Sequence, residues 1–218
     1  MGRPRILKLD QIIDVALKIG VDQLTMSKVA DALGVSKAVL YNYVSNREEL
    51  IELSAGHAVL QHPFPTDEGQ PWENYVFEYA RALLDFFVHH GQLISTYVQG
   101  DFGPLIQTEG AEIWLSVLTR QGFEGPEALK LQQSVETVVL GSALNWIHAQ
   151  ATVQSGRTYA AQAHEALERR GARELPLLDQ YIDAFAAKGD YKRWEYAIEL
   201  LIAGAEAKKA RRENAPSG

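Results

Sequence analysis

Apolar residues recur at helical spacing along most of the chain. Near the start, Ile12, Ile13, Ala16 and Leu17 follow an i, i+1, i+4, i+5 pattern that ends at Gly20. Asn-Gly and Asp-Gly turns are missing from the sequence, and so is sustained period-two alternation, which is the usual signal of strands. The pattern therefore predicts an all-α fold.

Two short helices joined through a glycine are predicted in residues 25–44. Thr25 is placed to cap a helix over 27–33, Gly34 ends it, and Ser36 caps a second helix over 37–43. The apolar positions expected to form a small core between them are Val29, Ala30, Leu33, Val35 and Leu40. This is the pattern of a helix-turn-helix, whose second helix enters the DNA major groove. A plain helical hairpin with surface Tyr and Lys is the alternative.

Longer helices are predicted over the rest of the chain. Their ranges are 47–62, 72–89, 109–121, 126–153, 175–187 and 190–209, with short helical pieces in 92–106 and a polar loop with some helix in 155–173. Ser45 and Glu48 have the spacing of a capping box at the first of these helices. The Pro-rich break after His62 divides the chain into an N-terminal helix-turn-helix domain over 1–46, a connecting helix over 47–62 and a larger C-terminal domain over 63–218.

Composition narrows the class of protein. The chain has 218 residues, of which 46% are hydrophobic and none is Cys, so disulfides, thiolate metal sites and thiol nucleophiles are excluded. The net charge of −7 is uneven, because residues 1–47 hold seven Lys and Arg against four Asp. Gly-rich phosphate loops, His-Glu-x-x-His and Gly-x-Ser-x-Gly are missing, which disfavours an enzyme.

A membrane location is not expected. The first residues lack the apolar stretch of a signal peptide, which favours a cytoplasmic protein. Residues 137–156 carry no formal charge and are long enough to span a bilayer, but they include several polar side chains such as Asn145 and His148. We expect protein rather than lipid to bury this helix.

The polar residues of the predicted helix-turn-helix are candidates for contact with DNA, because phosphate oxygens accept hydrogen bonds from hydroxyls, from lysines and from the backbone N–H groups at helix N-termini. They are Thr25, Ser27, Lys28, Ser36, Lys37, Tyr41, Asn42 and Tyr43. Arg3 and Arg5 form a basic arm ahead of them.

Four stretches of the head, LTMSKVA at 24–30, LGVS at 33–36, LYNYV at 40–44 and NREEL at 46–50, closely resemble the TetR family of bacterial transcriptional repressors. The similarity continues into the C-terminal domain. Trp72 and the segments 121–123, 139–141, 175–178 and 200–204 resemble the tetracycline-repressor branch.

The resemblance implies a homodimer that binds a palindromic double-stranded DNA operator. By position, Thr25, Tyr43 and Arg47 would hold phosphates. Lys37 and Ala38 would contact bases, with Lys37 donating to guanine, and Tyr41 would touch backbone or a thymine methyl group. The Arg3 and Arg5 arm would reach phosphate or the minor groove.

The family's C-terminal domain holds a small-molecule inducer, and this chain offers an apolar and aromatic lining with a few polar groups. The candidate ligand-binding residues are His62, Trp72, Tyr75, Tyr79, Leu83, Phe86, Ser95, Trp114, Thr137, Asn145 and Trp146. The alternative is that these aromatics at helical spacing form a filled core.

One departure from the tetracycline repressors concerns their magnesium-chelated drug. Ser95 stands where those repressors have a metal-binding histidine, and Asn145 stands where a glutamate assists. Magnesium prefers hard oxygen ligands, and nothing replaces the set. We therefore expect a largely apolar inducer, with no metal and no cofactor.

Dimerisation is expected through the helices over 126–153 and 190–209. The apolar stripes assigned to this interface are Val135, Val138, Val139, Ser142 and Trp146 in the first helix, and Trp194, Ala197, Ile198, Leu201, Ile202 and Ala205 in the second. The predicted function is a ligand-responsive transcriptional repressor. The alternatives are a TetR-like DNA-binding regulator without a small-molecule ligand, or an activator.

Overall fold

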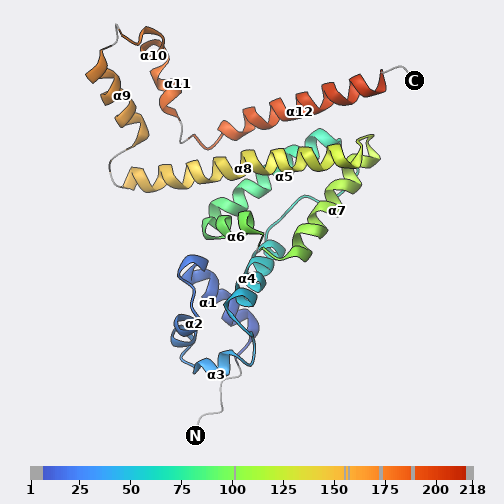
Figure 1. The fold of residues 1–218 in the computed structure, drawn as a ribbon, viewed down its shortest axis with the longest axis vertical. Coiled ribbons are helices and arrows are strands. Elements are labelled where there is room, and N and C mark those ends of the chain that lie inside the picture. The colour runs from blue at the N-terminus through green and yellow to red at the C-terminus, as the bar shows by residue number, and fades with distance from the viewer. Residues whose placement is uncertain are drawn as a thin grey trace. The chain divides into compact units, whose positions relative to one another are not determined.

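A computed structural model describes residues 7–100, 102–154, 156, 158–171, 174–187 and 190–214. Every secondary-structure element within these residues is a helix, so the prediction of an all-α fold is confirmed (Figure 1). Arg3 and Arg5, the predicted basic arm, lie outside the described residues.

The chain forms two compact units. The first unit comprises Met1–Phe64 and Gln92–Ile113, and the second comprises Pro65–Gly91 and Trp114–Gly218. Residues 92–113 therefore pack with the N-terminal part, whereas the sequence had placed them in a continuous domain over 63–218. Gly56 of the N-terminal part leaves room for Ile106 to pack closely against it. The Ile106 Cδ1 atom lies 3.0 Å from the position that a Cβ atom on residue 56 would occupy.

The first unit contains the N-terminal helices and one segment from the middle of the chain. Its helices are α1 (Leu9–Ile19), the 3-10 helix η1 (Val21–Gln23), α2 (Met26–Leu33), α3 (Lys37–Leu40), α4 (Arg47–Gln61), η2 (Gly91–Leu93, of which Gly91 lies in the second unit), α6 (Ile94–Gln99) and the first part of α7 (Pro104–Arg120). Ile12, Val29, Leu40 and Leu50 are fully buried, so α1 to α4 share one small core.

The second unit is built around its longest helix. It contains α5 (Trp72–His89), the end of α7, α8 (Gly125–Gln154), α9 (Tyr159–Arg170), α10 (Pro176–Gln180), α11 (Ile182–Ala186) and α12 (Arg193–Glu213). Helices α5 and α12 both lie along α8, whereas α9 and α11 pack against each other (Figure 1).

The packing of α8 corrects the predicted dimer interface. Val135 and Val139 of α8, like Trp194 and Ile198 of α12, are buried within the single chain. These residues fill the core that α8 shares with α5 and α12. Part of the stripe predicted for dimerisation is therefore packed within the chain, its other residues such as Val138 and Leu201 are half-buried, and a further face of each helix is exposed.

Most helix ends agree with the sequence, and α5 covers the predicted 72–89. Helix α7 begins at Pro104 rather than at 109, because proline suits the first turn of a helix. The single helix predicted over 175–187 is broken at Tyr181, where the backbone leaves helical geometry (φ −119°, ψ 20°). Thr158 caps α9, which occupies most of the segment predicted as a polar loop.

Among the described residues, no helix is both long and apolar enough to cross a membrane.

Candidate functional site

Local capping fixes the geometry of α2 and α3. The Thr25 hydroxyl accepts a hydrogen bond from the Lys28 backbone N–H (3.2 Å), and the Ser36 hydroxyl accepts one from the Val39 N–H (3.4 Å). Gly34 ends α2 with a left-handed φ of +68°, a conformation that costs glycine little. The predicted caps and the turn between the two helices are confirmed.

Helix α3 ends at Leu40 rather than at 43, and together with the turn that follows it presents an exposed, mostly polar surface, which we call the α3 face. It consists of Ser36, Lys37, Ala38, Val39, Tyr41, Asn42 and Tyr43. Leu40, in their midst, is fully buried and holds the helix to the core. Tyr41 is half exposed, and Val39 is 38% exposed although valine is usually buried. Val39 was not among the site residues predicted from the sequence, and its signal is an apolar side chain that does not share the buried position of Leu40.

Two capping hydroxyls retain capacity for a further ligand. In their caps, Thr25 and Ser36 act as acceptors, so each hydroxyl hydrogen remains available to donate. Lys28 is exposed, and its Nζ atom donates to the Gln23 side chain at 3.2 Å. Ser27 is half-buried at the start of α2.

Arg47, predicted to hold a DNA phosphate, has bonds inside the protein. Its Nε atom donates to the Leu24 carbonyl oxygen at 2.9 Å, and its Nη2 atom donates to the Val21 carbonyl oxygen at 2.8 Å. The guanidinium thus bonds the carbonyls at both ends of η1, of which that of Val21 also accepts the Leu24 backbone N–H, and it fastens the start of α4 to this turn. This geometry assigns Arg47 a positioning role.

The predicted capping box of Ser45 and Glu48 does not form at α4. Asn46, not Ser45, caps the helix, and its side-chain oxygen accepts from the Glu49 N–H at 2.7 Å. In return, the Glu49 carboxylate accepts the Ser45 backbone N–H. This hydrogen bond lowers the pKa of the Glu49 carboxyl.

The aromatic candidates in the second unit form a packed cluster. Trp114 is fully buried, with its ring centre 5.8 Å from that of Tyr75 and 5.0 Å from that of Tyr79. Its indole Nε1 donates to the Ala128 carbonyl oxygen at 2.8 Å. The Tyr79 hydroxyl donates to Glu136 at 3.3 Å, and burial raises the pKa of Tyr75 to about 12.

Other apolar candidates extend this cluster along α5. Trp72 packs edge-on against Phe123 with 4.7 Å between ring centres, and its backbone N–H donates to the Gln121 side chain. Leu83 and Phe86 are also buried. Contacts of this kind are typical of a hydrophobic core. The aromatic candidates of this cluster therefore pack against other protein side chains, as the alternative of a filled core requires.

The remaining ligand-binding candidates lie outside the contacts described for this aromatic cluster. His62 lies in the first unit, where it follows α4 and meets Phe64 edge-on at 4.9 Å. Thr137 and Asn145 are exposed on α8, and the Thr137 hydroxyl donates to the Gln133 carbonyl oxygen. Trp146 contacts Tyr191 at 5.1 Å between ring centres.

Ser95 and Asn145, the two positions at which the sequence departs from the tetracycline repressors, lie in different units of the chain. Ser95 and Asn145 are uncharged, and Ser95 lies on α6 in the first unit. Within the described ranges, no three His, Asp or Glu side chains are grouped as a metal site requires.

Comparisons with known proteins cover nearly the whole chain. Residues 9–53 match the model of the bacterial regulatory proteins of the tetR family, and residues 64–209 match the tetracyclin repressor-like C-terminal domain. The class E tetracycline repressor protein of Escherichia coli is 26% identical, over 96% of each chain. The HTH-type transcriptional repressor DrrR1 of Streptomyces coeruleorubidus is 25% identical, over 96% of this chain and 82% of the relative.

A similar fold is found in ActR of Streptomyces coelicolor, a TetR family protein solved in complex with actinorhodin. The two chains are 27% identical with a TM-score of 0.78, over 94% of this chain and 97% of ActR. A complex of ActR with (S)-DNPA gives a TM-score of 0.74 and 29% identity, over 93% of this chain and 98% of ActR.

Proposed function

Because this chain belongs to the TetR family of bacterial regulatory proteins, which are not enzymes, we propose that it is a ligand-responsive transcriptional repressor. It binds a palindromic DNA operator as a homodimer and leaves it when a small inducer binds. The observation that carries the DNA-binding part is the α3 face, which is polar, exposed and held by a buried Leu40.

On the α3 face, each residue has a proposed contact. Lys37 and Ala38 open the helix and reach base edges, and Val39 adds an apolar contact suited to a thymine methyl group. Tyr41 lies against the backbone or a thymine methyl group. The residues proposed to hold phosphates and sugars are Thr25, Ser27, Lys28, Ser36, Asn42 and Tyr43, together with the arm of Arg3 and Arg5.

The homodimer is supported by the apolar faces that α8 and α12 leave uncovered. Leu144 of α8 is 53% exposed, and Tyr196 and Leu200 of α12 are 68% and 56% exposed. Gly141 and Gly204 on the same faces are also exposed and allow close helix approach. A second copy of the chain buries these faces in a four-helix bundle. Two α3 helices are then about 34–36 Å apart, one turn of DNA.

An aromatic inducer is supported by the cluster around Trp114 and by the relatives. ActR was solved with actinorhodin, and several relatives are named as tetracycline repressors. The rings of Tyr75, Tyr79 and Trp114 supply the apolar surface that such a ligand needs, and the Tyr79–Glu136 pair supplies polar contacts. The inducer must favour the DNA-free conformation by a few kcal/mol, or the equilibrium does not move.

The close packing of these rings favours a second candidate, a TetR-family regulator that responds to no small molecule. Operator release distinguishes the two. An operator selected from random DNA is titrated with the protein by fluorescence anisotropy, and then actinorhodin or tetracycline with magnesium is added. We expect a planar aromatic compound such as actinorhodin to release the DNA and magnesium–tetracycline to have no effect. Release by magnesium–tetracycline contradicts our interpretation of Ser95 and Asn145.

A further inference from the structure

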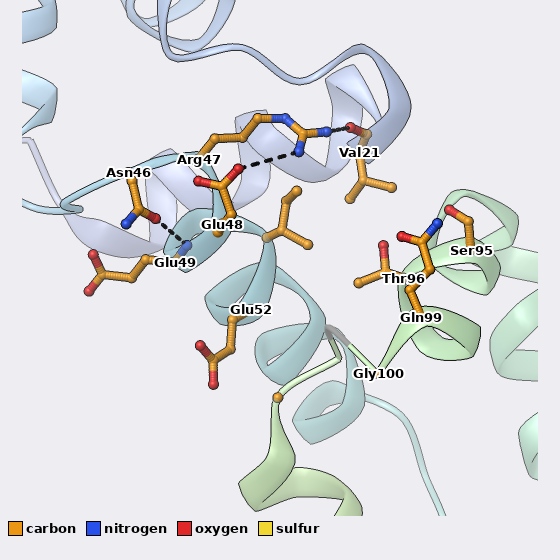
Figure 2. A pocket seen from close by; sticks show the side chains of 12 residues that line it. Val21, Asn46, Arg47, Glu48, Glu49, Glu52, Ser95, Thr96, Gln99 and Gly100 are labelled. Atoms are coloured by element: carbon orange, nitrogen blue, oxygen red, sulfur yellow. Dashed lines mark hydrogen bonds and ion pairs between the residues drawn. The ribbon is translucent and has the colours of Figure 1, made fainter.

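A polar cavity of about 560 Å³ lies inside the first unit, between the start of α4 and α6 (Figure 2). Helix α4 contributes Arg47, Glu48 and Glu52 to its lining, and α6 contributes Ser95, Thr96 and Gln99. None of the aromatic candidates lines this cavity. Its volume is within the range of small-molecule sites, but its lining is far more polar than usual.

Thr96 is the residue that points most directly to a ligand. The residue is only 6% exposed, and its side chain lines the cavity. Among the described residues, its hydroxyl has no hydrogen-bond partner, and because the oxygen is not shut off from solvent it can bond a ligand in the cavity. Figure 2 shows the hydroxyls of Ser95 and Thr96 and the Gln99 amide on one wall, facing the side where Arg47 and Val21 lie.

The charge of the opposite wall selects the kind of ligand. Glu48, Glu49 and Glu52 line the cavity together with Arg47. The Glu49 carboxylate accepts the Ser45 backbone N–H and points away from α6 (Figure 2), which leaves two carboxylates against one guanidinium. Arg47 already donates to two backbone carbonyls, and its nearest approach to Glu48 is a loose 3.9 Å. The cavity is therefore net negative, and a cation entering it is attracted.

We propose that this cavity is a second ligand site, which takes a small hydroxylated amine of the amino-sugar class. The ammonium lies near Glu48 and Glu52, and the hydroxyls exchange hydrogen bonds with Ser95, Thr96 and Gln99. This site is separate from the aromatic cluster, and its existence does not depend on the repressor function. Because the ligand bridges α4 and α6, it holds these two helices of the first unit together.

Three monosaccharides that differ in charge test the proposal on the full-length protein. Glucosamine, glucose and glucuronate are titrated below neutral pH, where the amine is protonated, and backbone amide shifts are followed by NMR. We expect shifts at Ser95, Thr96 and Gln99, with millimolar binding typical of so small a ligand. Glucosamine binds about fivefold more tightly than glucose, as one partly screened ion pair predicts, and glucuronate binds most weakly.

Variants assign the effect to the cavity. Glu48→Gln combined with Glu52→Gln reduces glucosamine binding to the level of glucose, and Thr96→Val weakens all three sugars about fivefold by removing one hydrogen bond. Thr96→Ser keeps the hydroxyl and restores binding. The matched controls Glu168→Gln and Thr119→Val, at exposed positions of the second unit, change nothing.

The proposal is overturned if no sugar shifts the α6 amides, if all three bind equally, or if the variants bind like the parent protein. Operator binding is measured separately on the same samples. A protein that binds its operator but no amino sugar refutes the second site alone.

Discussion

The Nε atom of Arg47 donates a 2.9 Å hydrogen bond to the carbonyl oxygen of Leu24, a residue 23 positions earlier in the chain. Leu24 immediately precedes Thr25, the cap of α2. A side chain at the first turn of α4 therefore holds the turn from which the helix-turn-helix begins, and the orientation of α2 depends on it.

Replacing Arg47 tests this positioning role. Arg47→Met leaves the Leu24 carbonyl without its donor, whereas the Val21 carbonyl keeps the Leu24 backbone N–H, so we expect the free energy of unfolding to fall by about 1–3 kcal/mol in urea denaturation. Operator affinity falls as well, but the salt dependence of the remaining binding keeps its slope. In contrast, loss of a phosphate contact lowers that slope by about one. Arg47→Lys keeps the charge without the two-pronged geometry, so its stability resembles that of Arg47→Met. A stable Arg47→Lys variant with full operator affinity supports phosphate binding instead.

Lys37 and Tyr43 are expected to differ in what they recognise. Lys37→Ala changes the preferred base at one position of each half-site, because a base contact contributes about 1–3 kcal/mol of discrimination. Tyr43→Ala weakens binding to all sequences alike, because backbone contacts carry no direct sequence information. Selection of DNA from a random pool measures both effects. If Lys37→Ala weakens binding to all sequences equally, Lys37 contacts the DNA backbone rather than a base.

The exposed apolar faces of α8 and α12 predict which substitutions separate the subunits. Leu144→Glu and Leu200→Glu each remove a leucine whose burial stabilises an interface by about 1.5–3 kcal/mol, and two-fold symmetry doubles the loss. Sedimentation should then show monomers where the parent protein is dimeric. Leu60→Glu is the control, since Leu60 is 84% exposed on α4. Dimers that persist in both variants place the interface elsewhere.

An ion pair in the second unit predicts a response to acid. Arg120 donates to Asp67 at 2.7 Å, and this hydrogen bond lowers the pKa of the Asp67 carboxyl below its usual 3.8. A lowered pKa stabilises the fold above the unfolded-state value, and the contribution is lost as the pH falls through the folded-state value. Asp67→Asn should therefore be less stable at neutral pH and lose less stability on acidification. Identical acid dependence of the two proteins contradicts this.

Helices with explicit end signals could be predicted from the sequence, and those without could not. Pro71 and Gly91 bracket α5, whose bounds agree with the expectation. In contrast, the predicted helix over 175–187 is broken at Tyr181, where neither Gly nor Pro marks the break in the sequence. The N-cap of α4 was misassigned because the pairs Ser45–Glu48 and Asn46–Glu49 have the same spacing, and only backbone geometry selects Asn46 as the cap.

Some features of the functional site could likewise be predicted from the sequence, and others could not. That Leu40 is the buried position of α3 and that its neighbours are exposed follows from the spacing of apolar residues in the sequence. The role of Arg47 does not, because its acceptors are backbone carbonyls 23 and 26 positions away, and no side-chain pattern encodes them. Likewise, α8 has apolar residues on more than one face, so periodicity cannot say which face meets its own chain and which meets a second copy.

The central claim is that α3 is a DNA-reading helix that is doubled by symmetry. Its most direct test is to select duplexes from a random pool with the full-length protein and to determine the protein-to-DNA stoichiometry and salt dependence of the selected site. We predict a palindrome with half-site centres about 10–10.5 base pairs apart or a multiple of that spacing, two protomers per site, and affinity that falls steeply as salt rises. A protein that selects no sequence and binds no duplex at low salt contradicts the account.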